Sequence, residues 1–509
     1  MNKIISFILL ACASQLSLAV GCTGAITDEL LCETAEIKFE SGEAATIKEK
    51  AISLGSVAKI YEYVRNNSGY QTYYGSRSGA LNSFLSQEGN DVDLASTLIA
   101  MYRSVGVKSR YVVGNVRLLR SDISNWISVG NDLLAVSILR DQGIEIIDDS
   151  DTDYVVIEHV WVEALVSFSS YRGGSATITS CSSESDNCKW VSLDPSFKLR
   201  KYQQQYRNLL ANLNFDYDAY YHAESNEVLR NKHPLEIFEE QALVYLRENH
   251  PGVTLEDVID EGEIITESLG LLPASLPYKV EGNPRRYNSV DAQHAAPDTV
   301  ERYGWIRQLM LVIKNNNGPT ECNISSHQLR LSDLATLRAG VSTLKDDDGA
   351  LALVLTVDGK LLSLLTRTDC DGAPISLGMK YNITFYTQGS PVGGLYEETK
   401  DYVVGGNYLF STGGYTSNWS QVERAYQRLQ ADVEQYPLVA NELGEVYVDE
   451  NNDGLIDDDE KLLLEHATAN DALTSGLLYT AQTLYNARYR QRSERYERLT
   501  NTIETISIW

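Results

Sequence analysis

The clearest periodic pattern in the chain is the stretch GNDVDLASTLIAMYRSVGVKSRYVVG, residues 89–114. Its apolar positions recur every three or four residues, which predicts an amphipathic helix followed by a short strand. The apolar positions are Leu94, Leu98, Met101 and Val105. Taken alone, this pattern makes Asn90 or Asp91 the N-cap and Asp93 a first-turn acid, because free amides and the helix dipole favour negative charge there.

Strand patterns follow this helix. The run YVVIEHVWVEALVSF, residues 154–168, alternates apolar with polar positions and is rich in valine, which predicts a strand. The run CKWVSLDPSF from Cys188 predicts another strand that ends at Asp194. A helical pattern also precedes residue 60. Helices followed by strands predict an α+β domain over residues 40–205.

Three further regions differ in pattern. Residues 206–290 are predicted to be helical, with Thr254 and Asp257 spaced as a capping box. Residues 300–412 contain short β runs, with a hairpin signal at 358–359, and predict a β-sandwich-like domain. Residues 416–509 are predicted to be helical around one acidic loop.

Length and charge narrow the possible partners. The 509 residues suffice for roughly three domains, each with its own core. The chain has 43 basic and 70 acidic residues, a net charge of −27, so it repels phosphate backbones and anionic lipids. We therefore expect no nucleic-acid partner. Beyond the N-terminus, no segment is apolar enough to predict a transmembrane helix.

The N-terminus has the pattern of an export signal. A lysine precedes an apolar core, and Ser17-Leu18-Ala19 fits the small residues that signal peptidase requires. Residues 1–19 are therefore predicted to be a signal peptide, which places the mature protein in the periplasm, outside the cell or on its surface.

Cysteine usage agrees with export. Cys12 lies in the signal, and six cysteines remain in three near-neighbour pairs. The predicted disulfides are Cys22–Cys32, Cys181–Cys188 and Cys322–Cys370. In the alternative interpretation, AVGC is a lipobox and Cys22 carries a lipid anchor, which would leave Cys32 without a partner.

The sequence DENNDGLIDDDE, residues 449–460, fits a calcium-binding loop at every position. The predicted oxygen ligands are Asp449, Asn451, Asp453, the Leu455 carbonyl, Asp457 and Glu460. The alternative is a solvated acidic turn. A single loop of this kind predicts a structural Ca²⁺ ion, with KLLLEHA as the exiting helix.

Three separate positions form a candidate catalytic constellation: Asp91 at a helix start, His159 on one strand and Asp194 at the end of another. An acid or thiol at a helix N-terminus, a histidine and an orienting acid are the elements of a nucleophile, base and orienting group. Without the motif that surrounds it, a single histidine on a strand such as His159 would be interpreted as a structural residue.

With these motifs the chain resembles the transglutaminase-like superfamily, which has a papain-like core. The family's H-x-W-V-E motif is matched by EHVWVE around His159, and its W-x-x-x-D-P-[ST] motif by residues 190–196. The family's cysteine position holds Asp91 instead. GNDVDLASTLIA, LDPSFK and LPASLPY are similar to a branch found in bacterial surface proteins, and what is known of that branch implies an acid at this position.

Aspartate in place of cysteine changes the expected chemistry. A carboxylate at a helix N-terminus stays ionised, and its attack on an amide is far harder than that of a thiolate. We therefore expect a non-catalytic protein- or peptide-binding or assembly component of the cell envelope. The alternative is an amide hydrolase or acyl transferase that uses Asp91, His159 and Asp194.

Overall fold

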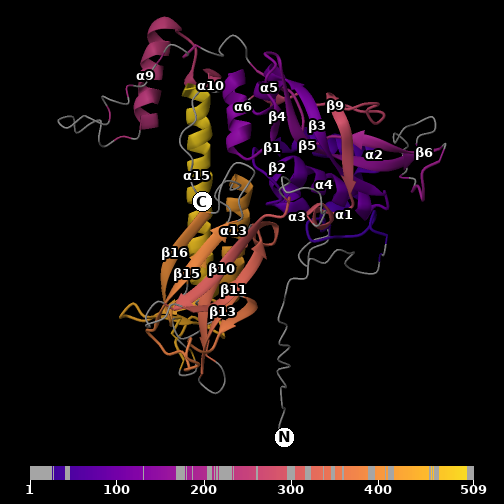
Figure 1. The fold of residues 1–509 in the computed structure, drawn as a ribbon. Coiled ribbons are helices and arrows are strands. Elements are labelled where there is room, and N and C mark those ends of the chain that lie inside the picture. The colour runs from indigo at the N-terminus through magenta and orange to yellow at the C-terminus, as the bar shows by residue number, and fades with distance from the viewer. Residues whose placement is uncertain are drawn as a thin grey trace.

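We describe the protein from a computed structural model (Figure 1). The structure describes residues 26, 28–39, 46–129, 131–167, 178, 180–185, 187–202, 209–210, 213, 216, 220, 232, 234–258, 262–294, 304–315, 322–335, 337–345, 350–357, 360–387, 396–406, 408–410, 418–457, 460, 462–463, 469 and 471–500. The predicted signal peptide and Cys22 lie outside these residues.

The N-terminal domain is built on a five-stranded sheet in the order β4-β5-β3-β9, with β6 also paired to β5. Its strands are β3 (Ser109–Leu119), β4 (Ile146–Asp148), β5 (Tyr154–Ser167), β6 (Cys188–Leu193) and β9 (Lys279–Tyr287). All the pairings are antiparallel. The strands predicted after residue 108 and over 154–168 are therefore confirmed within the described residues.

One edge of β5 is shared by two partners, and this arrangement creates the site. Strand β4 pairs with Val156 and Ile157. Strand β6 pairs with residues 162–167. The part of β5 between them has no partner strand on that edge, so its backbone groups must be satisfied by something else. The first turn of α4 (Asp91–Ser104) lies there.

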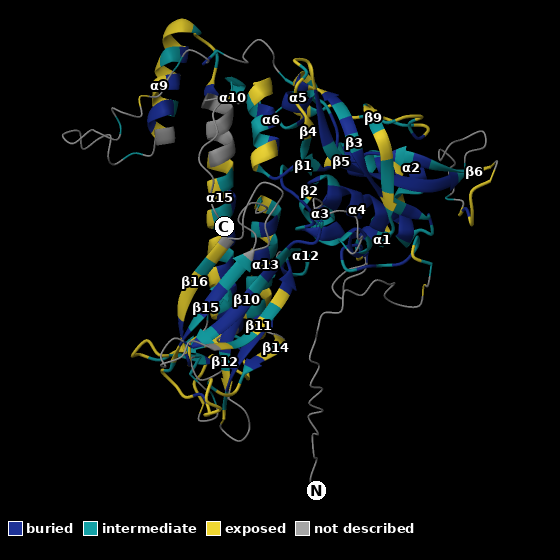
Figure 2. Cartoon of the chain, viewed as in Figure 1, coloured by how far each residue is buried: buried dark blue, intermediate teal, exposed yellow. Residues whose placement is uncertain are grey.

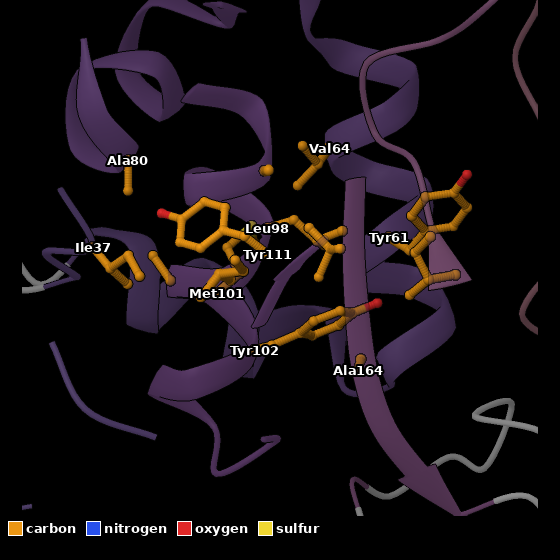
Figure 3. Close-up of a cluster of buried hydrophobic side chains, with 14 of the residues drawn as sticks. Ile37, Tyr61, Val64, Ala80, Leu98, Met101, Tyr102, Tyr111 and Ala164 are labelled. Atoms are coloured by element: carbon orange, nitrogen blue, oxygen red, sulfur yellow. The ribbon is translucent and has the colours of Figure 1, made fainter. Parts of the chain in front are cut away.

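Helices cover both faces of this sheet. The helices are α1 (Thr46–Leu54), α2 (Val57–Asn67), α3 (Gly79–Ser86), α4, α5 (Arg120–Trp126), α6 (Asp132–Asp141) and α11 (Val290–His294). Apolar residues of α1, α2 and α4 form one core with β3 and β5, in which Leu98, Met101 and Tyr111 are wholly buried (Figure 3). Trp126 and Leu139 belong to a second core on the other face. The helix predicted after Asn90 is confirmed.

The sequence prediction for residues 206–290 needs a correction. Helices α9 (Pro234–Asn249) and α10 (Leu255–Val258) are present, and Thr254 and Asp257 cap each other as expected. After Gly262, however, the chain leaves the helical path. Short strand β8 (Glu263–Ile264) pairs with β7 (Arg200–Lys201), and β9 joins the sheet beside β3. The charged, proline-containing sequence of β9 hides its strand character, because only its place at a sheet edge accommodates it.

The second domain consists of two four-stranded sheets, ordered β11-β10-β15-β16 and β14-β13-β12-β17. The strands are β10 (Gln308–Asn315), β11 (Cys322–Arg330), β12 (Ala339–Lys345), β13 (Leu351–Val357), β14 (Lys360–Thr366), β15 (Lys380–Thr387), β16 (Tyr396–Val403) and β17 (Tyr408–Phe410), with α12 (Leu331–Leu334) after β11. Both sheets contribute to one core that includes Leu311, Val341 and Leu355. Val357 pairs with Lys360 across the predicted hairpin. Its two turn residues lie outside the described residues.

The C-terminal region is a helical hairpin with a small β element. Helix α13 (Trp419–Gln435) packs against the π-helical turn η1 (Asp471–Ser475) and α15 (Gly476–Thr500), while β18 (Leu438–Ala440) pairs with β19 (Val446–Val448). The amphipathic pattern of α13 explains why it buries only one side (Figure 2). Among the described residues, no helix combines the length and apolarity that a membrane crossing needs.

Buried ion pairs join the two domains. Arg330, at the end of β11, bonds to Glu36 and to Asp291, and all three side chains are buried. Glu88, two residues before the N-cap of α4, accepts hydrogen bonds from Asn418 and Arg490 of the C-terminal region. The N-terminal domain is therefore tied to both later regions.

Candidate functional site

The site begins at the N-terminus of α4, where Asn90 is the N-cap. Its side-chain oxygen accepts from the amide of Asp93 at 2.9 Å, as the capping pattern requires. Its amide group donates to the carbonyls of Tyr73 and Gly75 at 2.9 and 2.8 Å. The N-cap therefore fixes the end of α4 to the loop that precedes α3.

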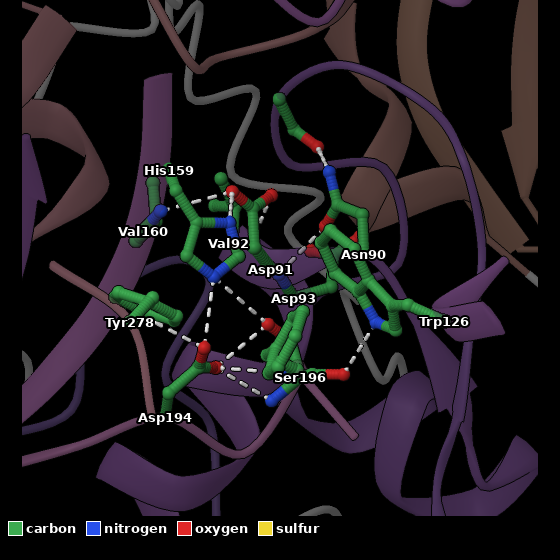
Figure 4. Close-up of polar contacts among 12 residues, drawn as sticks. Asn90, Asp91, Val92, Asp93, Trp126, His159, Val160, Asp194, Ser196 and Tyr278 are labelled. Atoms are coloured by element: carbon green, nitrogen blue, oxygen red, sulfur yellow. Dashed lines mark hydrogen bonds and ion pairs between the residues drawn. The ribbon is translucent and has the colours of Figure 1, made fainter. Parts of the chain in front are cut away.

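Asp91 projects from this first turn to the open edge of β5 (Figure 4). One carboxylate oxygen, Oδ2, accepts from the backbone amide of Val160 at 3.0 Å and lies 3.2 Å from Nδ1 of His159. The other, Oδ1, accepts from the amide of Val92 at 2.9 Å. Asp91 thus satisfies the backbone amide of β5 that lies between its two partner strands.

His159 and Asp194 complete the constellation. Nε2 of His159 lies 2.9 Å from Oδ2 of Asp194, so the imidazole lies between two carboxylates (Figure 4). The side chains of His159 and Asp194 are 1% and 0% exposed, whereas that of Asp91 is 14% exposed. The structure therefore brings all three predicted residues together, and Asp91 is the most accessible of them.

Asp194 is held by several further donors. Its Oδ1 accepts from the hydroxyl of Ser196 at 2.7 Å and from the amides of Ser196 and Phe197. The hydroxyl of Tyr278, which precedes β9, donates to Oδ2 at 2.9 Å. Every lone pair of this buried carboxylate is engaged, which is the condition for keeping a charge inside a protein.

The electrostatics of the pair follow from this geometry. Burial opposes the positive charge on His159, but Asp194 and then Asp91 outweigh it and raise the pKa of His159 to about 10. Burial likewise opposes the charge on Asp194, but His159 and the Ser196 bonds lower the pKa of Asp194 to about 2. The two carboxylates therefore favour the imidazolium form of His159, which can donate from both nitrogens.

Aromatic rings enclose the imidazole. The rings of Trp126 and Tyr278 meet it edge-on, with centroids at 5.5 and 5.6 Å. The indole N–H of Trp126 donates to the carbonyl of Ser196 at 2.9 Å, which fixes the turn after Asp194. These rings exclude water from the His159–Asp194 pair and leave Asp91 as the side that solvent reaches.

Sequence reasoning missed several residues of this site. Asp93, interpreted as a first-turn acid, is completely buried and accepts from five donors of the loop before α3 and of the first residue of α3. The donors are the hydroxyls of Tyr73 and Ser76 and the amides of Arg77, Ser78 and Gly79. Tyr278 was missed as well, although it lies in the quoted LPASLPY segment. Only the folded chain brings these distant groups to the carboxylates.

The comparisons with known proteins agree with this geometry. A family model described as "Transglutaminase-like superfamily" matches residues 43–195. No curated protein and no solved structure matches the chain.

The predicted calcium ligands are less closely gathered than the residues around His159. Asp449 is buried and accepts from the amides of Asp453 and Gly454, and Asn451 donates to Asp457 at 3.0 Å. Oε1 of Glu460 is a buried oxygen with no hydrogen-bond partner. In the part of the chain that the structure describes, no three His, Cys, Asp or Glu side chains are gathered to hold a metal ion.

Most of the predicted exit helix, residues 461–467, lies outside the described residues. Leu462 forms an isolated bridge to Tyr447 of β19, so the chain is extended there. Calcium binding therefore stays a prediction.

The cysteine predictions are partly confirmed. Cys181 and Cys188 are joined by a disulfide, with the sulfur atoms 1.98 Å apart. Cys32 and Cys370 are each in a disulfide too. Their predicted partners, Cys22 and Cys322, stay predictions. The disulfide between Cys181 and Cys188 closes the loop that precedes β6 and Asp194, and neither cysteine belongs to the constellation of Asp91, His159 and Asp194.

The family match covers the residues that form the constellation. Its range includes Asp91, His159 and Asp194 and excludes the β domain and the C-terminal helices. Residues 43–195 of this protein therefore form a transglutaminase-like domain.

Proposed function

We propose that the protein is an exported component of a bacterial cell envelope whose transglutaminase-like domain binds a protein or peptide segment without catalysis. The observation that carries the proposal is the state of His159. Its two ring nitrogens lie 3.2 and 2.9 Å from carboxylate oxygens of Asp91 and Asp194, and these carboxylates outweigh burial and raise the pKa of His159 to about 10. An imidazolium with no free nitrogen lacks the acceptor that a general base needs.

The nucleophile position supports the same conclusion. Asp91 replaces the cysteine that the family resemblance implies, and its carboxylate is occupied by two backbone amides and His159. A carboxylate whose oxygens already accept these bonds is a poor nucleophile toward an amide. The arrangement instead closes the open edge of β5, because Asp91 accepts from the backbone amide of Val160.

One observation favours an amide hydrolase or acyl transferase as a second candidate. Asp91 is the exposed member of the three residues and lines a cleft, so a substrate could reach it. In that mechanism Asp91 and His159 would act on an amide or a water molecule, with Asp194 as orienting group.

The Asp91→Asn variant separates these two functions. Purified wild type is incubated with an amide peptide mixture and a fluorescent primary amine, and products are followed by mass spectrometry. We expect no hydrolysis and no amine incorporation by either protein. Turnover by wild type that the folded Asp91→Asn variant loses would replace the binding function by the enzymatic one.

Export has its own support and test. The Cys181–Cys188 disulfide suits an oxidising compartment, because such bonds are rare in the cytosol. Mass spectrometry of the mature chain should show cleavage after residue 19. An intact N-terminus with six free thiols would contradict export, and a lipid on Cys22 would support the alternative anchoring.

We also propose that residues 449–460 bind a structural Ca²⁺ ion. The twelve-residue ligand pattern and the buried, unpartnered Oε1 of Glu460 support this proposal. The left-handed backbone of Asn452 and Gly454, with φ of 56° and 76°, gives the loop its sharp turn.

A further inference from the structure

One arginine between the two domains is shared by two buried carboxylates. Nη1 of Arg330, at the end of β11, donates to Oε1 of Glu36 at 2.8 Å. The same guanidinium donates to both carboxylate oxygens of Asp291 on α11. The side chains of Arg330, Glu36 and Asp291 are 7%, 1% and 2% exposed. Two carboxylates and one guanidinium leave one negative charge uncompensated, and an uncompensated charge inside a protein is costly.

The two carboxylates of this cluster are not equally satisfied. Asp291 receives two guanidinium N–H groups, whereas Oε2 of Glu36 is buried and has no hydrogen-bond partner. A buried carboxylate oxygen without a donor favours the protonated acid. Burial is the main effect that raises the pKa of Glu36 from 4.5 to about 7, while Arg330 opposes this rise and Asp291 adds to it. The excess charge of the cluster is therefore removed most readily by a proton on Glu36.

Two further groups face Glu36. Asp333 on α12 adds to the negative potential there, but it pairs with Lys38 at 3.3 Å, and these two side chains are 40% and 53% exposed. Water screens such a pair, so its effect on the buried Glu36 is small. Tyr111 on β3 is wholly buried, and burial raises the pKa of its hydroxyl, so it stays uncharged where Glu36 titrates.

His294 is a second titratable group near Arg330. It follows Asp291 on α11, and its Nδ1 is buried without a hydrogen-bond partner. Burial is the main effect that lowers the pKa of His294, and Arg330 and Arg307 add to it. A histidine with a lowered pKa weakens the docked state as pH falls, whereas a carboxyl with a raised pKa weakens it as pH rises. The direction of a pH response therefore distinguishes His294 from Glu36.

The cluster lies beside the segments that hold the N-terminus of α4. The backbone carbonyl of Glu36 accepts from the amide of Ala80 in α3 at 2.8 Å, and α12 of the second domain packs against α3 (Figure 2). The amide of Ser76 donates to the carbonyl of Trp305, which precedes β10, at 2.8 Å. The hydroxyl of Ser76 donates to Asp93 at 3.0 Å. Docking of the second domain therefore bears directly on the loop that surrounds Asp93.

We propose that Glu36, Asp291 and Arg330 form a proton-linked latch between the N-terminal and second domains, in which docking places a proton on Glu36 and release returns it to solvent. With that proton, Arg330 is balanced by Asp291 alone and the cluster is neutral. The docked state then binds one proton more than the released state between pH 4.5, the ordinary pKa of Glu36, and its pKa of about 7 when buried. Docking is therefore tightest below this range and weakest above it, a property that goes beyond the proposed binding function.

The test follows the domain contact in the full-length protein by hydrogen–deuterium exchange at pH 5 and pH 8. The reporting amides are those of Ser76 and Ala80, which donate to the carbonyls of Trp305 and Glu36. Protection factors, which correct for the intrinsic effect of pH on exchange, measure how often the contact opens. We expect both protection factors to fall at least tenfold from pH 5 to pH 8. Amides of β15, inside the second domain, should keep theirs.

Glu36→Gln is the decisive variant, because glutamine has the shape of a protonated glutamate and cannot ionise. Both reporting amides should be as protected at pH 8 as at pH 5. Asp333→Asn makes a comparable acid-to-amide change on an exposed residue of the same contact, and it should keep the wild-type response. Asp291→Asn leaves one carboxylate for Arg330, so Glu36 stays ionised and the response should shrink below threefold. Circular dichroism checks that each variant is folded.

Three results would overturn the latch. They are unchanged protection in the wild type between pH 5 and pH 8, a response of equal size in folded Glu36→Gln, and protection that increases with pH. The last result would assign the pH response to His294 instead. If Glu36→Gln does not fold, a full wild-type response in Asp291→Asn would overturn the latch as well. None of these results bears on the non-catalytic function, which Asp91→Asn tests separately.

Discussion

The carboxylates at the start of α4 and those of the loop from Asp449 to Glu460 have similar sequences and different environments. In both places an acid accepts backbone amides of its own turn. In the first domain the acids Asp93 and Asp194 are wholly buried and receive donors from several distant segments. In the C-terminal loop, Asn451, Asp453 and Asp457 are exposed to solvent.

Acidic clusters of similar sequence can therefore serve opposite purposes. Donors already surround the buried carboxylates, so the folded protein needs no ion to compensate them. Among the described residues, the loop's carboxylates accept hydrogen bonds from the loop itself, so its charges depend on solvent or on a cation.

Asp93→Ala should be the most destabilising change. It removes the acceptor of five buried donors, and unpaired buried groups lower the free energy of unfolding by about 3–5 kcal/mol in such networks. Urea denaturation checks this value. Asp453→Ala in the exposed loop is the matched control and should change stability by less than about 0.5 kcal/mol without calcium. Equal effects would refute the contrast.

His159→Gln should lower the free energy of unfolding by about 3 kcal/mol at pH 6, and the difference from wild type should shrink as pH rises toward 10. The folded pKa of His159 is raised to about 10, after its carboxylate partners outweigh burial, from an unfolded value near 6.5. Its stabilisation is therefore complete below about pH 6.5 and is lost between there and pH 10. Denaturation of both proteins across this range measures it.

Asp194, the buried carboxylate partner of His159, should affect the free energy of unfolding in the acid pH range. Because the folded pKa of Asp194 is lowered to about 2, its stabilisation is present above its unfolded pKa near 4 and is lost as pH falls toward 2. A pH-independent difference between wild type and His159→Gln would show that the imidazole is neutral and would reopen its role as a base.

Calcium should stabilise the C-terminal region. Binding to the folded form alone adds RT ln(1 + [Ca²⁺]/Kd), about 2.7 kcal/mol at a hundredfold excess over Kd. Chelation should therefore lower Tm of the wild type, and Glu460→Gln should weaken that response. Glu450→Gln, beside the predicted ligands, is the control. An unchanged melting curve together with no heat of binding would make the loop a solvated turn.

Asp91→Asn should have the smallest effect on stability, about 1 kcal/mol or less. Its side chain is partly exposed, and the amide oxygen of asparagine can still accept from Val160 or Val92. The pKa of His159, followed by NMR, should fall because one of its two carboxylate neighbours is lost. A loss of stability comparable to that of Asp93→Ala would instead make Asp91 a core structural residue.

The local patterns that depend on neighbouring residues were readable from the sequence. The periodicity of α4, its N-cap, the alternation in β5, the capping box at Thr254 and the disulfide between Cys181 and Cys188 were all expected and are all present. The family motifs around His159 and Asp194 likewise pointed to a constellation. Such features depend on residue spacing or on short-range hydrogen bonds, which the sequence records directly.

Only the tertiary structure determines which of these distant residues contact one another. β9 has no clear strand pattern and joins the sheet because β3 offers a free edge, and in doing so it brings Tyr278 to Asp194. Asp93 looks like any first-turn acid until the loop before α3 folds over it. The protonation of His159 depends on burial and on two carboxylates from distant segments. The spacing of residues along the sequence reveals neither their burial nor their distance in space.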